Sequence, residues 1–192
     1  RSVVILDLLK SREERWADYS ATARNCIRRE SQLTVNENPD IDAFIDMYAL
    51  TMDRNRASGF YYFSRGYYDQ LLSLPNVHLF SIKGASAPLS MAWFMMSPDI
   101  AHYHLSANTP ESLKRNVNYV LLDRAFESAK ERGCQWFLLG GGRTNSPEDP
   151  LFRFKRKFSS ETRTFYIGSL VLVPDVYTRY NKIWTQKTGQ FP

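Results

Sequence analysis

The stretch FLLGGGRTNSPEDPLFRFKRKF, residues Phe137 to Phe158, decides the fold of this 192-residue chain. It leads an apolar run into three glycines, an acidic turn and then alternating aromatic and basic residues. Backbone at a glycine run can approach a ligand closely, and its amide groups can face an anion. The stretch has neither the Lys-Ser/Thr of a P-loop nor a GxGxxG motif. A structural turn and a ligand-binding loop therefore both stay open for Gly140, Gly141 and Gly142.

The segment after the glycines has the signals of a short helix. Glu148, Asp149 and Pro150 suit its first turn, because proline is tolerated at the first helical position. Beyond them, aromatic residues alternate with basic ones such as Arg153 and Lys155. Such a helix would hold cations close to whatever the glycines approach. A basic run is equally typical of a solvated helix face, so both interpretations remain.

Outward from this stretch, the spacing of apolar residues predicts alternating strands and helices. Strands are expected over residues 3–8, 77–83, 88–96, 100–106, 135–139 and 164–173, and helices over residues 11–27, 40–52, 64–74, 109–132, 147–158 and 174–189. The short turns GASA and SPD require antiparallel neighbours, and the helix over 109–132 suggests a parallel crossover. Asp123, off the apolar stripe of that helix, is expected to face solvent. We predict one mixed α/β domain over residues 1–192.

Composition indicates an ordinary folded domain. The chain has 43% hydrophobic and 23% charged residues, a composition that argues against a disordered protein. No apolar run approaches the roughly 18 residues that a membrane span needs. Its two cysteines, Cys26 and Cys134, make neither a disulfide framework nor a metal site. Buried thiols favour a cytoplasmic location. The net charge of +5 mildly favours anionic partners. The chain opens with Arg1 rather than Met, so a longer parent protein stays open, and the sequence does not indicate an oligomeric state.

Several segments, in order and correctly spaced, resemble one family. HYHLSAN (102–108), NVNYVLLDRAFESAKERG (116–133) and QWFLLGGGRTNSPEDPLFRFKRKFS (135–159) are similar to the C-terminal half of a Fem-type domain. RNCIRRE (24–30), FIDMYALTMDRN (44–55) and FYYFSRGYYDQLL (60–72) extend the resemblance toward the N-terminus. These proteins are the peptidoglycan-bridge aminoacyltransferases and their acetyltransferase-like relatives, which share the GNAT fold.

The resemblance implies a GNAT fold, with a mixed central sheet of about six or seven strands flanked by helices. It also implies acyl transfer to a primary amine, without a metal or a covalent enzyme intermediate. The donor would be aminoacyl-tRNA in Fem-type members or acetyl-coenzyme A in GNAT relatives, and no cofactor would be bound permanently. The acceptor could be a cell-wall precursor. Such a site must orient two substrates, take up a proton and stabilise an oxyanion.

The same resemblance assigns candidate site residues. Lys155 matches the family lysine near the reacting carbonyl or the donor's terminal phosphate-sugar, and a solvent-facing lysine is the competing interpretation. His104 falls in the family's Tyr-His-Leu-Ser element, where an imidazole suits proton transfer, although strand histidines are often structural. His102 alternates with it on the same strand. Substrate contacts are expected from Phe154, Gly140, Gly141, Gly142 and Asn118.

Two further groups have both a functional and a structural interpretation. Arg24 and Arg28 lie one helical turn apart and could grip a phosphate, or simply form a solvated helix face. The aromatic run around Tyr62 could line an acceptor groove or stack on a base, or belong to the core and its rim.

The chain departs from complete Fem enzymes, which usually carry two GNAT-like domains. It also lacks the GNAT coenzyme A loop, because SANTPESLKRNVN (106–118) occupies that place. Three hypotheses therefore remain. They are an aminoacyl-tRNA-dependent transferase, a coenzyme A-dependent N-acetyltransferase, and a non-catalytic tRNA- or protein-binding module of the same fold.

Overall fold

The computed structural model describes residues 1–37 and 39–190, and in these residues a seven-stranded mixed sheet has the order β2-β3-β4-β5-β6-β1-β7. The strands are β1 (Ser2–Asp7), β2 (Val35–Glu37), β3 (Val77–Lys83), β4 (Pro88–Met96), β5 (Ile100–Asn108), β6 (Trp136–Gly140) and β7 (Thr162–Thr164). The helices are α1 (Arg12–Asp18), α2 (Ala21–Arg29), α3 (Ile41–Arg54), the 3-10 helix η1 (Gly59–Tyr61), α4 (Arg65–Ser73), α5 (Pro110–Arg115), α6 (Asn118–Glu131), α7 (Pro150–Lys155) and α8 (Pro174–Thr188). The predicted mixed α/β class is confirmed.

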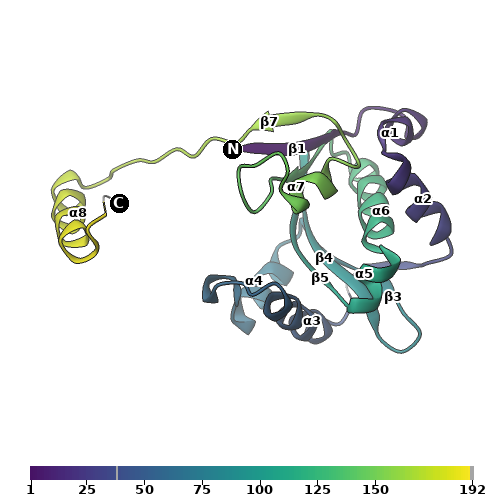
Figure 1. Ribbon diagram of the computed structural model, residues 1–192, viewed down its shortest axis with the longest axis horizontal. Helices are drawn as coiled ribbons and strands as arrows, with labels where there is room; N and C mark the ends of the chain where they lie inside the picture. The colour runs from purple at the N-terminus through teal and green to yellow at the C-terminus, as the bar shows by residue number, and fades with distance from the viewer. Residues whose placement is uncertain (38, 191–192) are drawn as a thin grey trace.

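The strand directions follow from the connections between strands. β2 to β5 are antiparallel neighbours, and the short turns around residues 84–87 and 97–99 predicted the pairing of β3 with β4 and of β4 with β5. β5 and β6 are parallel, because α5 and α6 form the crossover between them. β1 then adds antiparallel to β6, and β7 antiparallel to β1, so both ends of the domain meet at one edge of the sheet (Figure 1).

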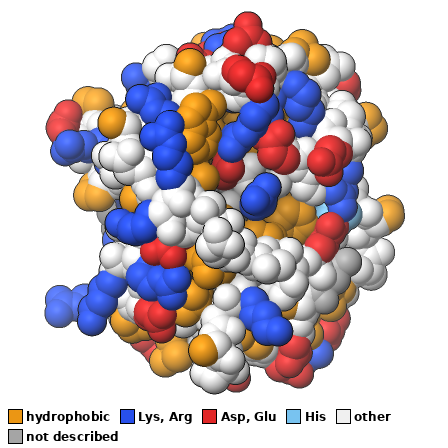
Figure 2. All heavy atoms as spheres, turned by 90° about the vertical axis from the view of Figure 1, so that its right-hand side faces the viewer, with side chains coloured by type: hydrophobic (Ala, Val, Ile, Leu, Met, Phe, Trp, Pro, Cys, Tyr) orange, Lys and Arg blue, Asp and Glu red, His pale blue; other side chains and the backbone are white. Residues whose placement is uncertain are grey.

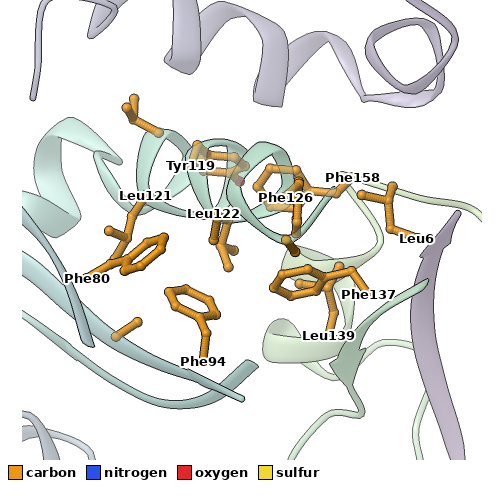
Figure 3. Packing of buried hydrophobic residues seen from close by; sticks show 14 of the residues in the cluster. Leu6, Phe80, Phe94, Tyr119, Leu121, Leu122, Phe126, Phe137, Leu139 and Phe158 are labelled. Carbon is orange, nitrogen blue, oxygen red and sulfur yellow. The ribbon is translucent and has the colours of Figure 1, made fainter. Parts of the chain in front are cut away.

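The larger apolar cluster fills the space between the sheet and the helices α1, α2 and α6. Aromatic rings dominate it. The ring centroids of Phe126 and Phe137 lie 4.7 Å apart, and those of Phe126 and Phe158 lie 5.3 Å apart, edge to face (Figure 3). Phe158 follows α7, so this cluster fixes the basic helix against the end of β6.

A second cluster covers the other face of the sheet, over β3, β4 and β5 only. Phe44 of α3 and Tyr68 of α4 pack here against Trp93 of β4. Figure 1 shows α3 and α4 on this side and α6 on the opposite side of the sheet. The part of this face that belongs to β6, β1 and β7 lies beyond both helices.

Three expectations need correction. The helix expected over 11–27 is two helices, because Ser20 caps α2 with its hydroxyl. The helix expected over 109–132 is also two, because Asn116 adopts a left-handed conformation with φ of 60°. Asp123 does not face solvent but is buried, since Arg12 donates two hydrogen bonds to its carboxylate, at 2.6 and 2.8 Å.

A fourth expectation, the long strand over 164–173, is wrong. Only Thr162–Thr164 pairs with β1, and the chain beyond Phe165 is exposed and extended until α8 begins. Figure 1 shows this segment leading away from the sheet, with α8 apart from the rest of the molecule.

Charged side chains of both signs are interspersed on the face shown in Figure 2. Several charged side chains of the protein form pairs, such as Arg132 with Glu37 at 2.7 Å and Arg115 with Glu30 at 2.6 Å. This face is therefore not a continuous basic surface. Among the helices of the described residues, none has the length and apolar character needed to cross a membrane.

Candidate active site

The site is built where two neighbouring strands separate. The parallel ladder of β5 and β6 ends at the pair His102 and Leu138, while β5 continues to Asn108 and β6 to Gly140. We call this point the fork. A β-bulge lies beside it on β5, since Phe94 pairs with Tyr103 and Trp93 with Leu105, leaving His104 as the extra residue. Bulges next to active sites typically redirect a side chain.

Each of the three glycines at the end of β6 is explained by a different structural constraint. Gly140 has φ of 81°, and a Cβ there would lie 3.2 Å from Lys155 Nζ. A Cβ on Gly141 would lie 2.8 Å from the backbone oxygen of Ser2. A Cβ on Gly142 would lie 2.5 Å from the carboxyl group of Asp149. Close approach of the chain's own groups therefore explains the run.

The anion beside these glycines is Asp149 itself. Its carboxylate accepts hydrogen bonds from the backbone amides of Arg143 and Thr144 at 3.0 and 2.9 Å, and from those of Leu151 and Phe152 at 2.9 and 3.1 Å. These bonds hold the pKa of Asp149 well below its usual range. The loop thus binds an internal carboxylate, which also caps α7.

Lys155 is the buried cation of the fork. Its side chain is 8% exposed, its Nζ donates a 2.8 Å hydrogen bond to the Gly141 carbonyl, and its Nζ lies 5.9 Å from the centre of the Tyr103 ring. Burial, with a smaller effect from Arg1, lowers the pKa of Lys155 to about 8. The ammonium group is therefore poised to lose its proton near neutral pH. The solvent-facing alternative for this lysine is excluded by its burial.

The two histidines of β5 lie on the other side of the fork. The hydroxyl of Tyr67, from α4, hydrogen bonds to Nε2 of His104, and the two imidazole rings lie 6.1 Å apart. Burial lowers the pKa of His104. The pKa of His102 is lowered by burial and then by the charges of His104 and Lys155. Both rings are thus neutral near pH 7 and able to accept a proton.

The fork thus has a buried ammonium group, that of Lys155, and two neutral imidazoles, those of His102 and His104. Comparison with known proteins gives its family, since residues 17–156 match the family model described as Acetyltransferase (GNAT) domain, well over half of the chain. The chain belongs to this GNAT family. The GNAT fold predicted from the sequence is confirmed.

Solved structures resemble this GNAT domain at low sequence identity. FemX matches with a TM-score of 0.71 and 14% identity over 84% of this chain and 59% of FemX. The C-terminal domain of a putative lysylphosphatidylglycerol synthetase from Agrobacterium fabrum matches with a TM-score of 0.55 and 16% identity, over 82% of this chain and 56% of that one.

An aminoglycoside acetyltransferase from an uncultured soil metagenomic sample, in complex with trehalose, matches with a TM-score of 0.56 and 13% identity. That match covers 74% of this chain and 99% of the acetyltransferase. The GNAT domain thus spans less than two thirds of FemX and of the synthetase domain. At these identities the likeness shows the fold alone. A search of curated proteins finds no significant match.

Other predicted site residues of the GNAT domain lie in structural roles or at its surface. Phe154 packs edge to face on Tyr119, with ring centroids 5.1 Å apart. Asn118 is the first residue of α6 and is half-buried. Tyr62 is exposed and donates a 2.6 Å hydrogen bond to Asp53. Their contacts with substrate stay predictions.

The predicted arginine pair is engaged by neighbouring groups. Arg24 donates to the carbonyls of Trp16, Ala17 and Tyr19 at the C-terminal end of α1. Arg28 lies with its guanidinium 5.3 Å from the ring centre of Trp16. A phosphate grip by this pair stays a prediction, and Arg24 has a structural role in addition.

Sequence reasoning gave no role to three residues that shape the fork. Asp149 was recognised only as a helix start, although the acidic residue before Pro150 is the signal of an N-cap. Tyr67 was one of several aromatics in its segment. His102 shares the alternation of His104 but lies at the last paired position of β5, which only the strand register reveals.

Proposed function

We propose that this domain transfers an activated acyl group to a primary amine, with Lys155 at the reacting carbonyl. The observation that carries the proposal is a buried ammonium group of lowered pKa, held at the strand fork by the carbonyl of Gly141. A preorganised cation in a partly desolvated site stabilises an oxyanion much better than water does. Perturbed lysines of this kind concentrate at functional sites.

The chemistry uses both sides of the fork. The amine attacks the acyl carbon of the donor, and the carbonyl oxygen becomes an oxyanion that Lys155 stabilises. The attacking nitrogen loses its proton to a neutral imidazole, His104 or His102. The bond to the leaving oxygen of the donor then breaks, and Lys155 can protonate that oxygen because its pKa lies near the working pH.

For the donor we propose aminoacyl-tRNA. This rests on the Fem-type motifs and on the segment between β5 and α6, where GNAT acetyltransferases place a coenzyme A loop. Here the segment forms α5, with Thr109 accepting from the amide of Ser112 at 3.0 Å and Ser112 donating to Asn108 at 3.1 Å. Arg115 is paired with Glu30 and Glu111. These groups are engaged within the protein, which disfavours a pyrophosphate site.

For the acceptor we propose an amine of a cell-wall precursor, met in the cytoplasm. The Fem-type motifs support it, and the fold likeness to FemX is consistent with it. Since the chain spans only part of FemX, this proposal concerns the chemistry of the domain, and a partner domain can complete acceptor recognition.

Coenzyme A-dependent N-acetylation is a second candidate. One observation favours it, namely that the similar aminoglycoside acetyltransferase is matched over 99% of its length, so this fold without a second domain occurs in an acetyltransferase.

A transfer assay tests the proposal and separates the donors. Product masses are measured with aminoacyl-tRNA or acetyl-coenzyme A against a panel of amines and cell-wall precursors. Lys155→Met should lower the rate by about 100-fold or more, as loss of an oxyanion-stabilising group does. Lys157→Met, the same change two residues on, is the matched control and should keep the rate.

The outcomes divide cleanly. Consumption of acetyl-coenzyme A alone overturns the aminoacyl-tRNA donor and supports acetylation. Equal rates for the wild type and Lys155→Met overturn the role of the lysine. If neither donor is consumed, the proposed acyl transfer by this domain fails, and binding of tRNA that ignores the aminoacyl group would then support the binding module.

A further inference from the structure

The C-terminal arm, residues 165–190, concentrates exposed apolar side chains. Tyr166, Ile167, Leu170 and Leu172 are each more than 80% exposed. Patches of this kind on a soluble protein mark interaction sites. The arm extends from the edge of the sheet, and its helix α8 lies apart from the rest of the molecule (Figure 1).

Helix α8 has one apolar stripe. Val176, Tyr177, Tyr180, Ile183 and Trp184 follow the spacing i, i+1, i+4, i+7, i+8, which places them on one face, and all are exposed. An isolated helix of 15 residues is marginal in water, so this one needs a partner for its stripe.

The same chain carries an apolar hollow. It measures about 310 Å³ and lies on the part of the sheet that α3 and α4 leave uncovered, with Val3, Ile5, Ile100, Trp136 and Leu138 among its lining residues. Val3 and Ile5 alternate along β1 with Val4 and Leu6, which belong to the cluster under α6. The hollow is therefore on the opposite face of the sheet from α6.

We propose that two copies of this chain exchange their arms, so that the apolar stripe of α8 in each copy packs into the hollow of the other. Each copy offers one stripe and one hollow, which is the self-complementarity that a two-fold dimer requires. The arm begins at the hollow, since Phe165 lines it, but residues 165–173 carry α8 away from its own domain. Nine extended residues reach about 30 Å, enough to cross to a neighbouring copy.

The surface available is sufficient for a stable dimer. Five aromatic side chains of the arm are about half exposed or more. At roughly 150–250 Å² for each fully buried aromatic, they would bury about 600 Å² per arm. Two arms would thus reach about 1,200 Å² from aromatics alone, the lower bound of a specific interface.

Light scattering after size-exclusion chromatography tests the exchange on the full chain. The wild type should have twice the monomer mass of 22.3 kDa. The arm variant Tyr180→Glu/Trp184→Glu and the hollow variant Ile100→Glu should each be monomeric. Lys182→Glu, a charge change at an exposed polar position of the same helix, is the matched control and should remain dimeric. Circular dichroism melts verify that each variant is folded.

Mixing the two monomeric variants gives the decisive measurement. The intact arm of the hollow variant fits the intact hollow of the arm variant, so the mixture should regain a heterodimer with one exchanged contact. A wild-type monomer overturns the proposal, whether the arm folds back on its own domain or binds a different protein. Dimers that survive both variants, or a mixture that stays monomeric, overturn it as well.

Discussion

Lys155 links the proposed chemistry to the stability of the fold, because it places an ammonium group in a buried position. The shift of its pKa from 10.5 to about 8 means that the fold disfavours the charged form. One pKa unit corresponds to about 1.4 kcal/mol, so the cost is on the order of 3 kcal/mol at neutral pH. Keeping this ammonium group at the fork therefore lowers the stability of the domain.

The pH dependence of unfolding should reveal this cost. Between pH 8 and about 10.5 the unfolded chain holds a proton on Lys155 that the folded chain has released, so stability rises with pH through this window. Below the window the cost is fully present. The wild type minus Lys155→Met difference in unfolding free energy should therefore increase by up to about 3 kcal/mol across it.

Urea unfolding at several pH values measures this difference. Taking the difference cancels the buried tyrosines, such as Tyr103, whose pKa is raised to about 12 by burial. Lys157→Met serves again as the control and should follow the wild type. A difference that stays flat with pH would mean that folding does not lower the pKa of Lys155.

At this same scale, the glycine run shows what the sequence could and could not predict. Its position at the end of a strand and the helix after it were correctly predicted. The anion that the loop binds could not be, because an internal carboxylate such as Asp149 and an external phosphate both suit backbone amides. Only the structure shows which oxygen accepts the hydrogen bonds of these amides.

At the scale of elements, a charged cluster holds α1 against α6. Asp123 of α6 accepts from Arg12 and from the Tyr19 hydroxyl at 3.0 Å, while Arg15, fully buried, donates to Glu127 at 2.6 Å. The Asp123 carboxylate is thus the shared acceptor of the Arg12 guanidinium and the Tyr19 hydroxyl. Its loss would leave the buried Tyr19 hydroxyl without this acceptor and Arg12 with only Glu127, at 3.3 Å.

Asp123→Ala should therefore destabilise the domain by about 3 kcal/mol, the lower end for a broken buried pair, because Arg12 remains partly exposed. Glu131→Ala, at an exposed position of the same helix, should change stability by less than about 0.5 kcal/mol. Urea unfolding of both variants at pH 7 gives the comparison. Equal effects would show that the cluster does not stabilise the contact between α1 and α6.

Elements with local signals were the ones that the sequence predicted well. The strands β3, β4 and β5 and the parallel crossover to β6 followed from turn length and apolar spacing. The break at Asn116 was missed, because one left-handed residue interrupts a helix without disturbing the apolar stripe. The prediction of a strand over 164–173 was wrong, because an apolar run forms a strand only where a neighbouring strand is available for pairing.

At the scale of the whole molecule, the arm and the domain should contribute to stability separately. Both apolar clusters consist of residues before 160, so the domain has its core without the arm. If two copies exchange arms, association stabilises the folded state by mass action, and the melting temperature of the full chain rises with protein concentration. The charged arm variant should lose that dependence while keeping the domain folded.

A chain ending at Phe165 gives the sharpest form of this prediction. It retains β7 and the hydrogen bond from the Phe165 amide to the Arg1 carbonyl, so the sheet keeps its edge. We expect it to melt cooperatively at a temperature independent of concentration, equal to that of the charged arm variant. Differential scanning calorimetry over a concentration series measures both. If the shortened chain fails to fold, the arm belongs to the domain core. If its melting temperature still rises with concentration, the copies associate through another surface.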